Sequence, residues 1–312
     1  MSKRKSGLDI HGIVLLDKRS GISSNRALQE VRRLFNANKA GHTGSLDPLA
    51  SGLLPLCLGE ATKIAGFMLD EHKRYEVVVQ LGVTTDTGDT DGAVIAQKPV
   101  PDLSESDIKR CLAKFTGSMA QIPPMYSALK HNGKKLYELA RKGETIERKP
   151  RSINVFELRL TGFGQDWLAL AVHCSKGTYI RSLAEDIGND LGCGATVSQL
   201  RRTAVGPFDI ANARTLEGLQ LMNRQELHAC LIDVDKPLGF LPAFALSREQ
   251  AGCVVQGQPV NAGSRLPGLV RLYHAEAFLG LGEILMNGKL APKRMFNMNI
   301  EYLNHKLMAH EA

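Results

Sequence analysis

A short apolar run over residues 12–17 and alternating side chains over residues 74–82 and 168–174 predict β-strands in these three stretches. In the second stretch every other residue is apolar or aromatic: Tyr75, Val77, Val79 and Leu81. Because successive side chains of a strand point to opposite faces, these four residues share one face. Tyr75 is therefore expected at the start of a strand, on the same side as its apolar neighbours.

Apolar residues recur at helical spacing in three other stretches. Two of them cover residues 25–35 and 105–115, and the third carries Leu183, Ile187 and Leu191. The predicted strands and helices are interspersed without a regular β-α-β rhythm. This arrangement favours the α+β fold class.

The helix ends can be predicted from capping residues. We expect the first helix to be capped from Ser24 or Asn25, and the second to begin with a capping box made by Ser104 and Asp107. Arg181 falls where the last predicted strand gives way to a helix. A cation at a helix N-terminus is mildly unfavourable, so this position suggests a special role for Arg181.

A change of pattern divides the chain into two folded units. We expect a large domain over residues 11–236, preceded by a basic tail over residues 1–10. A proline-containing linker follows over residues 237–245. Short strands and many turns over residues 246–300 predict a small β-barrel, and residues 301–312 a loose tail.

The composition is that of a globular protein with an excess of basic residues. Hydrophobic residues make up 43% of the chain, which is ample for packed cores, and 39 Lys and Arg against 32 Asp and Glu give a net charge of +7. Polyanion binding is plausible, although so modest an excess does not separate an RNA-binding protein from any other basic enzyme.

The six cysteines are far apart, which favours reduced thiols over disulfides or a zinc site. The apolar run from Ile13 to Leu16 is too short for a signal peptide or a membrane span, so a cytoplasmic protein is expected.

The segment over residues 41–48 is the strongest candidate for chemistry. Pro48 fixes its own φ and moves Asp47 away from the α region, while Gly41 and Gly44 permit backbone shapes that other residues resist. The Asp47 carboxylate is then presented by a tight loop. On spacing alone, an ordinary Asp-Pro turn remains the alternative.

This segment and four others, in the same order, resemble the motifs of the TruB family of tRNA pseudouridine-55 synthases. The matching stretches are residues 11–18 with 21–25, 41–55, 73–75 with 81–92, 122–130 and 174–181. Departures are local: Arg19 stands where the family usually has a proline, and residues 214–244 match only loosely. The resemblance implies a pseudouridine synthase catalytic domain with a mixed, mainly antiparallel sheet flanked by helices. Residues 246–300 resemble a PUA domain, a small β-barrel that binds RNA.

The resemblance also implies the roles of the site residues. Asp47 is the nucleophile, Arg181 forms an ion pair with it, and Tyr75 stacks on the target base and handles protons. Asp47 must be ionised in a site that the base has dried, so a permanently charged guanidinium with a planar fork is a suitable partner. Substrate-binding roles fall on four more residues: His42, which wedges into the space left by the base, Tyr179, Leu200 and Lys18. For Leu200 a plain core role fits nearly as well.

Isomerising uridine to pseudouridine needs a nucleophile and proton transfers but no cofactor, and none is expected. The three aspartates over residues 86–92 miss calcium-loop spacing, so a turn is expected there and no metal site. The expected partner is tRNA, bound at the T-stem-loop and the acceptor stem by a monomer. Whether Asp47 attacks C6 of the base or C1′ of the ribose stays open. A tRNA-folding chaperone is the second hypothesis and can coexist with catalysis, whereas a carboxylate-dependent nuclease would want a cluster of acidic metal ligands.

Overall fold

The structure is a computed structural model that describes residues 7–263 and 266–298. The start of the predicted basic tail, the end of the predicted barrel and the predicted C-terminal tail lie outside the described residues. The strands are β1 (Gly12–Lys18), β2 (Ala40–His42), β3 (Ser51–Leu58), β4 (Lys73–Leu81), β5 (Val83–Thr85), β6 (Val94–Gln97), β7 (Gly117–Gln121), β8 (Lys130–His131), β9 (Lys134–Lys135), β10 (Arg151–Phe163), β11 (Trp167–Cys174), β12 (Ala195–Val205), β13 (Phe208–Asp209), β14 (Arg214–Thr215), β15 (Ala243–Ala245), β16 (Val260–Asn261), β17 (Gly268–His274), β18 (Ala277–Ile284) and β19 (Lys289–Met295). The helices are α1 (Ser24–Leu34), α2 (Ala65–Leu69), α3 (Glu105–Lys114), α4 (Leu136–Ala140), α5 (Ile180–Asp190), α6 (Leu216–Gln220), α7 (Arg224–Ala229) and α8 (Arg248–Val255), with 3-10 turns η1 (Gly59–Ile64), η2 (Ile210–Asn212) and η3 (Lys236–Leu238).

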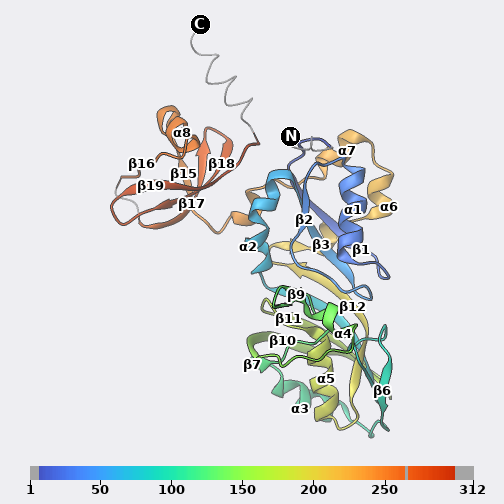
Figure 1. The fold of residues 1–312 in the computed structure, drawn as a ribbon. Coiled ribbons are helices and arrows are strands. Elements are labelled where there is room, and N and C mark those ends of the chain that lie inside the picture. Colours follow the sequence, from blue (N-terminus) through green and yellow to red (C-terminus); the bar gives the residue numbers. More distant parts are fainter. Residues whose placement is uncertain (1–6, 264–265, 299–312) are drawn as a thin grey trace.

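A mixed β-sheet extends through the larger unit (Figure 1). Its strands follow the order β14-β1-β3-β12-β4-β11-β10-β7, with β2 added on β3 and β13 on β12. The β1–β14 and β12–β3 pairs are parallel and the others antiparallel. The α+β prediction is confirmed, and so is the predicted sheet.

The predicted elements agree with the observed ones to within a residue or two at their ends. Ser104 and Asp107 form the predicted capping box of α3. The predicted cap of α1 is wrong: Ser23 accepts the hydrogen bond from the Arg26 N–H, and the helix begins at Ser24. Ser24 is used elsewhere, because its hydroxyl turns away from the helix to the loop that carries Asp47.

The two faces of the sheet differ around β4. Val77, Val79 and Leu81 are buried in a core that includes Ile108 of α3 and Ile187 of α5. The intervening residues of β4 are exposed or half-buried. We call the side of the sheet that carries these intervening residues the open face. The opposite side, with Tyr75, Val77 and the helices, is called the helix-covered face.

The sheet consists of two halves that meet at one short junction. One half is built around β1 and β3, the other around β12, β4, β11 and β10, and β3 and β12 pair only at Ser51 with Arg201 and Gly52 with Arg202. Gly52 has φ +101°, and a Cβ there would lie 2.3 Å from the Arg202 carbonyl oxygen. Only glycine allows the two halves to approach so closely.

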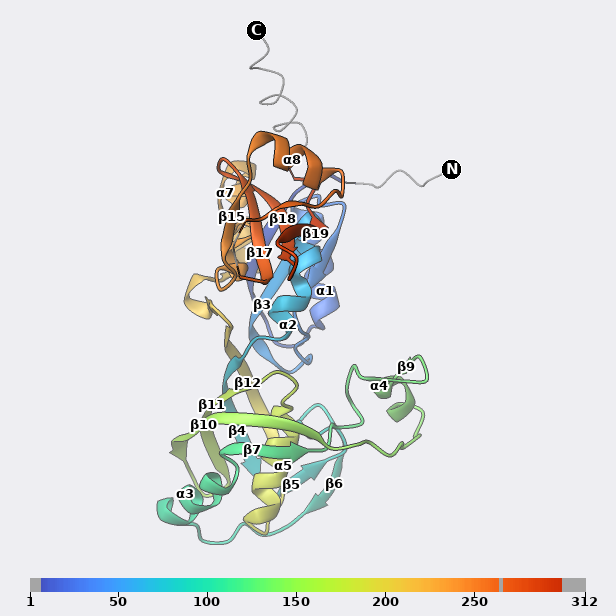
Figure 2. The ribbon, with the colours of Figure 1, turned by 90° about the vertical axis from the view of Figure 1, so that its left-hand side faces the viewer.

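The C-terminal unit is a curled five-stranded sheet with the order β15-β17-β18-β19-β16, and α8 packs on it (Figure 2). Its first strand, β15, lies within the segment predicted as a linker. Phe278 and Leu281 of β18 and Phe296 share a buried core with Ile13 and Leu53 of the large sheet. The two units are therefore packed against each other through a common hydrophobic cluster. Within the described residues no helix has the length and apolarity needed to cross a membrane.

Candidate active site

The loop between β2 and β3 that carries Asp47 is fixed by contacts with a distant part of the chain. Ser24, the first residue of α1, accepts a hydrogen bond from the Leu46 N–H at 2.7 Å and donates its hydroxyl to the Leu46 carbonyl at 2.9 Å. The Gly21 N–H donates to the Pro48 carbonyl at 2.8 Å. A side chain held by such a framework keeps one orientation, which suits a reactive group.

Arg181 forms an ion pair with Asp47. Its Nε lies 2.9 Å from Asp47 Oδ2, and its side chain is only 6% exposed. Nη1 donates to the Thr87 carbonyl at 2.6 Å and Nη2 to the Tyr126 carbonyl at 2.8 Å. The fork was expected to face the carboxylate, but its Nη1 and Nη2 donate to these two carbonyls, and the 2.9 Å contact with Asp47 is made by Nε. The backbone therefore fixes Arg181, and Arg181 in turn fixes Asp47.

The Asp47 side chain is partly exposed to solvent. It is 41% exposed, so a substrate can reach it, while the surrounding protein still limits its hydration. Burial raises the pKa of Asp47 and the Asp89 carboxylate acts in the same direction, whereas the Arg181 guanidinium and the Lys18 ammonium act to lower it. The site thus offers an accessible carboxylate whose charged form depends on neighbouring cations.

Tyr75 and Arg202 lie opposite each other on the helix-covered face of the sheet, in the register of β4 and β12. Burial raises the pKa of the Tyr75 hydroxyl, and the nearby Arg202 guanidinium acts in the opposite direction. With its pKa raised, Tyr75 is a neutral phenol at physiological pH. It can donate a proton or stack on a ring, and it is a poor base in the free protein.

Lys18 and His42 approach the same region from the β1–β3 half of the sheet. Lys18 is 1% exposed, and its ammonium donates to the carbonyls of Arg19 and Ile22 at 2.9 and 2.8 Å. Burial lowers the pKa of Lys18 to about 8, and the Asp47 carboxylate acts in the opposite direction. Burial also lowers the pKa of His42, with Arg202 contributing, which favours a neutral imidazole.

The remaining predicted site residues lie on the other half. Tyr179 precedes α5, and the Gln121 amide holds its backbone on both sides, accepting from the Tyr179 N–H at 2.8 Å and donating to its carbonyl at 3.0 Å. Burial raises the pKa of Tyr179. Leu200 is 8% exposed on β12 opposite Val77, which is the geometry of a core residue. Its predicted role in substrate binding stays a prediction.

Two residues of this site were not predicted from the sequence. Asp89, expected to be part of a plain turn, lies with Oδ2 3.6 Å from Arg181 Nη1, and its side chain is 7% exposed. Arg202 is 2% exposed and donates to the Leu53 carbonyl at 2.8 Å and the Gly44 carbonyl at 3.1 Å. In the sequence, Arg202 stands out only as one of two adjacent arginines, and Asp89 only as one of three aspartates over residues 86–92.

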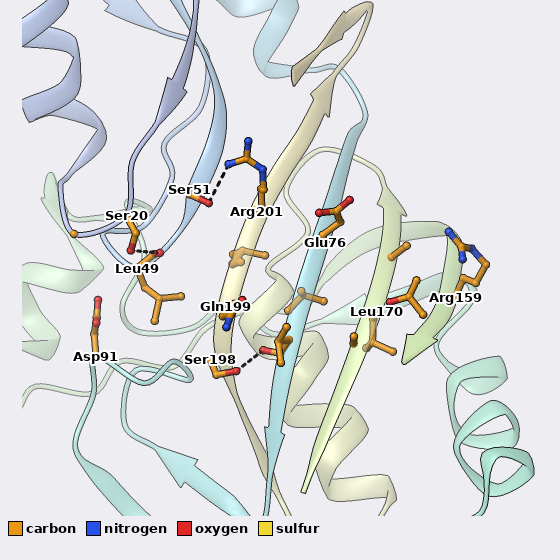
Figure 3. Close-up of a pocket in the computed structure, with 17 residues that line it drawn as sticks. Ser20, Leu49, Ser51, Glu76, Asp91, Arg159, Leu170, Ser198, Gln199 and Arg201 are labelled. Atoms are coloured by element: carbon orange, nitrogen blue, oxygen red, sulfur yellow. Dashed lines mark hydrogen bonds between the residues drawn. The ribbon is translucent and has the colours of Figure 1, made fainter. Parts of the chain in front are cut away.

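Residues of the open face help to line a cleft of about 650 Å³ (Figure 3); Asp47 is not part of its lining, although Leu49 of the same loop is. Glu76, Gln199 and Arg201 line it, and they belong to the opposite side of the sheet from Tyr75 and Arg202. Among residues 7–263 and 266–298, no group of three or more His, Cys, Asp or Glu side chains is arranged to hold a metal ion.

Three family models together match most of the chain. The N-terminal domain of TruB family pseudouridylate synthases matches residues 32–180. The C-terminal domain of tRNA pseudouridylate synthase B matches residues 181–239, and the C-terminal region of TruB pseudouridine synthase II matches residues 242–296.

The chain is also similar over nearly its whole length to curated proteins named tRNA pseudouridine synthase B. The one from Chromohalobacter salexigens is 48% identical over 300 residues, covering 95% of this chain and 98% of the relative. The one from Stutzerimonas stutzeri is 50% identical over 293 residues, with 92% and 96% covered. The one from Serratia proteamaculans is 47% identical over 314 residues, with 96% and 99% covered.

Solved structures show the same fold. A chain of a Cbf5-Nop10-Gar1 complex is 25% identical, with a TM-score of 0.69 and 91% of this chain and 84% of that chain covered. A chain of an archaeal box H/ACA sRNP Nop10-Cbf5 complex is 22% identical, with a TM-score of 0.70 and 97% and 94% covered. At this identity the second likeness supports the architecture alone.

Proposed function

This chain belongs to the TruB family of pseudouridylate synthases and is a tRNA pseudouridine synthase, an isomerase; on that premise we propose that it converts the T-loop uridine of tRNA with Asp47 as the nucleophile. The observation that carries this proposal is the contact between Asp47 and Arg181. It joins an accessible carboxylate to a cation that backbone carbonyls hold in place. Such a carboxylate is oriented and reachable, and the adjacent guanidinium favours its charged form, as nucleophilic catalysis requires.

The target uridine must leave its stack before Asp47 can reach it. Turning a base out costs about a few kcal/mol, and stacking on an aromatic side chain recovers about 1–3 kcal/mol. We assign this stacking to Tyr75 and the filling of the vacated space to His42. A neutral imidazole suits that role, because it enters the stacked bases without a charge to be desolvated. Tyr179, Leu200 and Lys18 are proposed to line or support the base site.

The chemistry balances without a cofactor. The bond between C1′ and N1 breaks, a bond between C1′ and C5 forms, N1 gains a proton and the C5 proton is released. Asp47 forms a transient covalent bond, either with C6 of the base or with C1′, and is regenerated when the product forms. We assign a part in the proton transfers to the Tyr75 hydroxyl, whose raised pKa keeps it protonated until the base is bound.

We further propose that the unit over residues 246–300 binds the acceptor stem through its phosphates, and that the protein acts as a cytoplasmic monomer. In the whole protein, the catalytic domain would extend over residues 11–236, and the linker between the two units over residues 237–245. Phosphate contacts position a nucleic acid without reading its sequence. Binding would then weaken steeply as the salt concentration rises.

The proposed substrate can be tested with tRNA transcripts tritiated at uridine C5, in the absence of metal and nucleotide. We expect release of tritium from the full transcript and from an isolated T-arm stem-loop. A transcript in which the T-loop uridine is replaced by cytidine should release none. Undiminished release from the cytidine transcript would show that another uridine is the target.

A tRNA-folding activity can accompany catalysis, because binding and remodelling use shape and charge and do not need the Asp47 nucleophile. Asp47→Asn keeps the shape of the side chain and should bind tRNA within a few fold of the parent. It should then still speed the refolding of a misfolded tRNA. A parent protein that leaves the refolding rate unchanged would contradict this activity.

A further inference from the structure

Arg202 lies where the two halves of the large sheet meet. The nucleophile Asp47 comes from the β1–β3 half, whereas Tyr75 and Arg181 come from the other half. The halves are in strand register at two residue pairs only, and Gly52 opposite Arg202 is one of them. Because so few residues pair across the junction, the distance from Asp47 to Tyr75 and Arg181 must also depend on side-chain contacts between the two halves.

The Arg202 side chain spans this junction. It starts on β12, donates from Nε to the Leu53 carbonyl of β3 at 2.8 Å, and donates from Nη2 to the Gly44 carbonyl at 3.1 Å. Gly44 lies three residues before Asp47 in the same loop and has φ +107°. One guanidinium therefore connects the second half of the sheet to the first half and to the catalytic loop.

We propose that Arg202 is a positioning residue for the reaction: by bridging β12 to the Gly44 carbonyl, it sets the place of Asp47 relative to Tyr75 and Arg181. The proposal rests on the function proposed above. Arg202 is 2% exposed and both of its carbonyl acceptors belong to the protein, so it acts through the loop and does not touch substrate. Its length and planar fork are both needed, because the two acceptors lie on different segments.

Charge supports the same assignment. Arg202 contributes to the electrostatic environment of three site groups, acting to lower the pKa of Lys18, His42 and Tyr75. A neutral replacement should therefore change the titration of His42, whereas a lysine should preserve it. This difference separates the charge of Arg202 from its bridging geometry.

The test compares Arg202→Met and Arg202→Lys with Arg201→Met. Arg201 is the adjacent residue of β12 and lies toward Ser51 at the cleft (Figure 3). It too links the two halves, but its Nη2 lies 2.7 Å from Asp17 of β1, and not at the loop that carries Asp47. We expect kcat on tRNA to fall about 100-fold in Arg202→Met, since a displacement of about 1 Å in a reacting group can cost this much. Arg202→Lys reaches one carbonyl and should lose about 10-fold, whereas Arg201→Met should lose less than 3-fold.

Three further measurements keep the result interpretable. The tRNA dissociation constant should stay within about 3-fold of the parent in all three variants, which also reports the folded fraction. By nuclear magnetic resonance, the pKa of His42 should rise in Arg202→Met and stay low in Arg202→Lys. A combination of Arg202→Met with Tyr75→Phe should lose less activity than the product of the two single losses.

Parent-level kcat in folded Arg202→Met would overturn the assignment, and so would an equal loss in Arg201→Met. A loss confined to tRNA affinity would show that Arg202 acts in binding instead. These outcomes are distinct from failure of the proposed function, in which the parent protein itself would leave tRNA unmodified.

Discussion

At the scale of single residues, the site depends on one arginine whose three guanidinium nitrogens each contact a different residue. Arg181 meets Asp47 through Nε and the carbonyls of Thr87 and Tyr126 through its two terminal nitrogens. The motifs predicted that Asp47 and Arg181 form an ion pair, and the two side chains lie 2.9 Å apart; their roles in catalysis stay predictions. Asp89 and Arg202 were missed because their roles depend on contacts between segments far apart in the sequence, which local patterns do not encode.

Replacing Arg181 by lysine should remove most of the activity. Lysine keeps the charge but has one nitrogen, so it cannot hold Asp47 and both carbonyls together. The carbonyls that lose their hydrogen-bond donor are partly buried, and this loss destabilises the folded protein. We expect kcat to fall at least about 100-fold in single-turnover assays, with tRNA affinity within a few fold. A variant that keeps more than half of the parental kcat would show that the contacts of the terminal nitrogens are dispensable.

The pH dependence of kcat/KM should report the ionisation of Asp47. Attack needs the carboxylate, so activity is present above the Asp47 pKa and is lost as pH falls through it. Because burial raises this pKa, the acid limb should lie above the ordinary aspartate range. In Arg181→Met the cation that lowers the pKa is gone, so the limb should move to higher pH; an unmoved limb would assign it to another group.

At the scale of elements, the start of α1 stabilises the catalytic loop. The sequence predicted this helix but placed its cap at Ser24 or Asn25, whereas Ser23 is the cap and Ser24 is hydrogen bonded to Leu46. Serine at either position satisfies the capping pattern. Only the tertiary structure tells which of the two hydroxyls is needed by the loop.

The adjacent serines therefore provide a matched pair of variants. Ser23→Ala removes a cap and should lower the free energy of unfolding by about 1 kcal/mol with little change in kcat. Ser24→Ala leaves buried loop groups without a partner, which costs about 1–3 kcal/mol, and should also lower kcat about 10-fold by loosening the loop. Denaturant titration and single-turnover assays measure both quantities. Equal kcat values in the two variants would contradict the role of Ser24.

At the scale of the whole molecule, the two units share a hydrophobic core. Phe278 and Phe296 of the C-terminal unit pack in one cluster with Ile13 and Leu53 of the large sheet. The sequence predicted a second unit and several of its strands. It did not predict this packing, because the apolar residues involved read as ordinary strand residues until both surfaces are known.

Phe278→Ala should consequently destabilise both units together. Truncating a buried phenylalanine costs about 3–5 kcal/mol, and a shared core spreads this cost over the cooperative unit. Calorimetry should show one transition in the parent and one, at lower temperature, in the variant. Separate transitions, with only the smaller one shifted by the substitution, would mean that the two units unfold independently.

The central claim, that Asp47 performs the isomerisation, is tested most directly by tritium release from C5-labelled tRNA. The parent protein is compared with Asp47→Asn and with a control, Asp102→Asn, which changes an exposed aspartate outside the site. We predict release by the parent and the control, and none by Asp47→Asn even though it still binds tRNA. Near-parental release by Asp47→Asn would contradict the account.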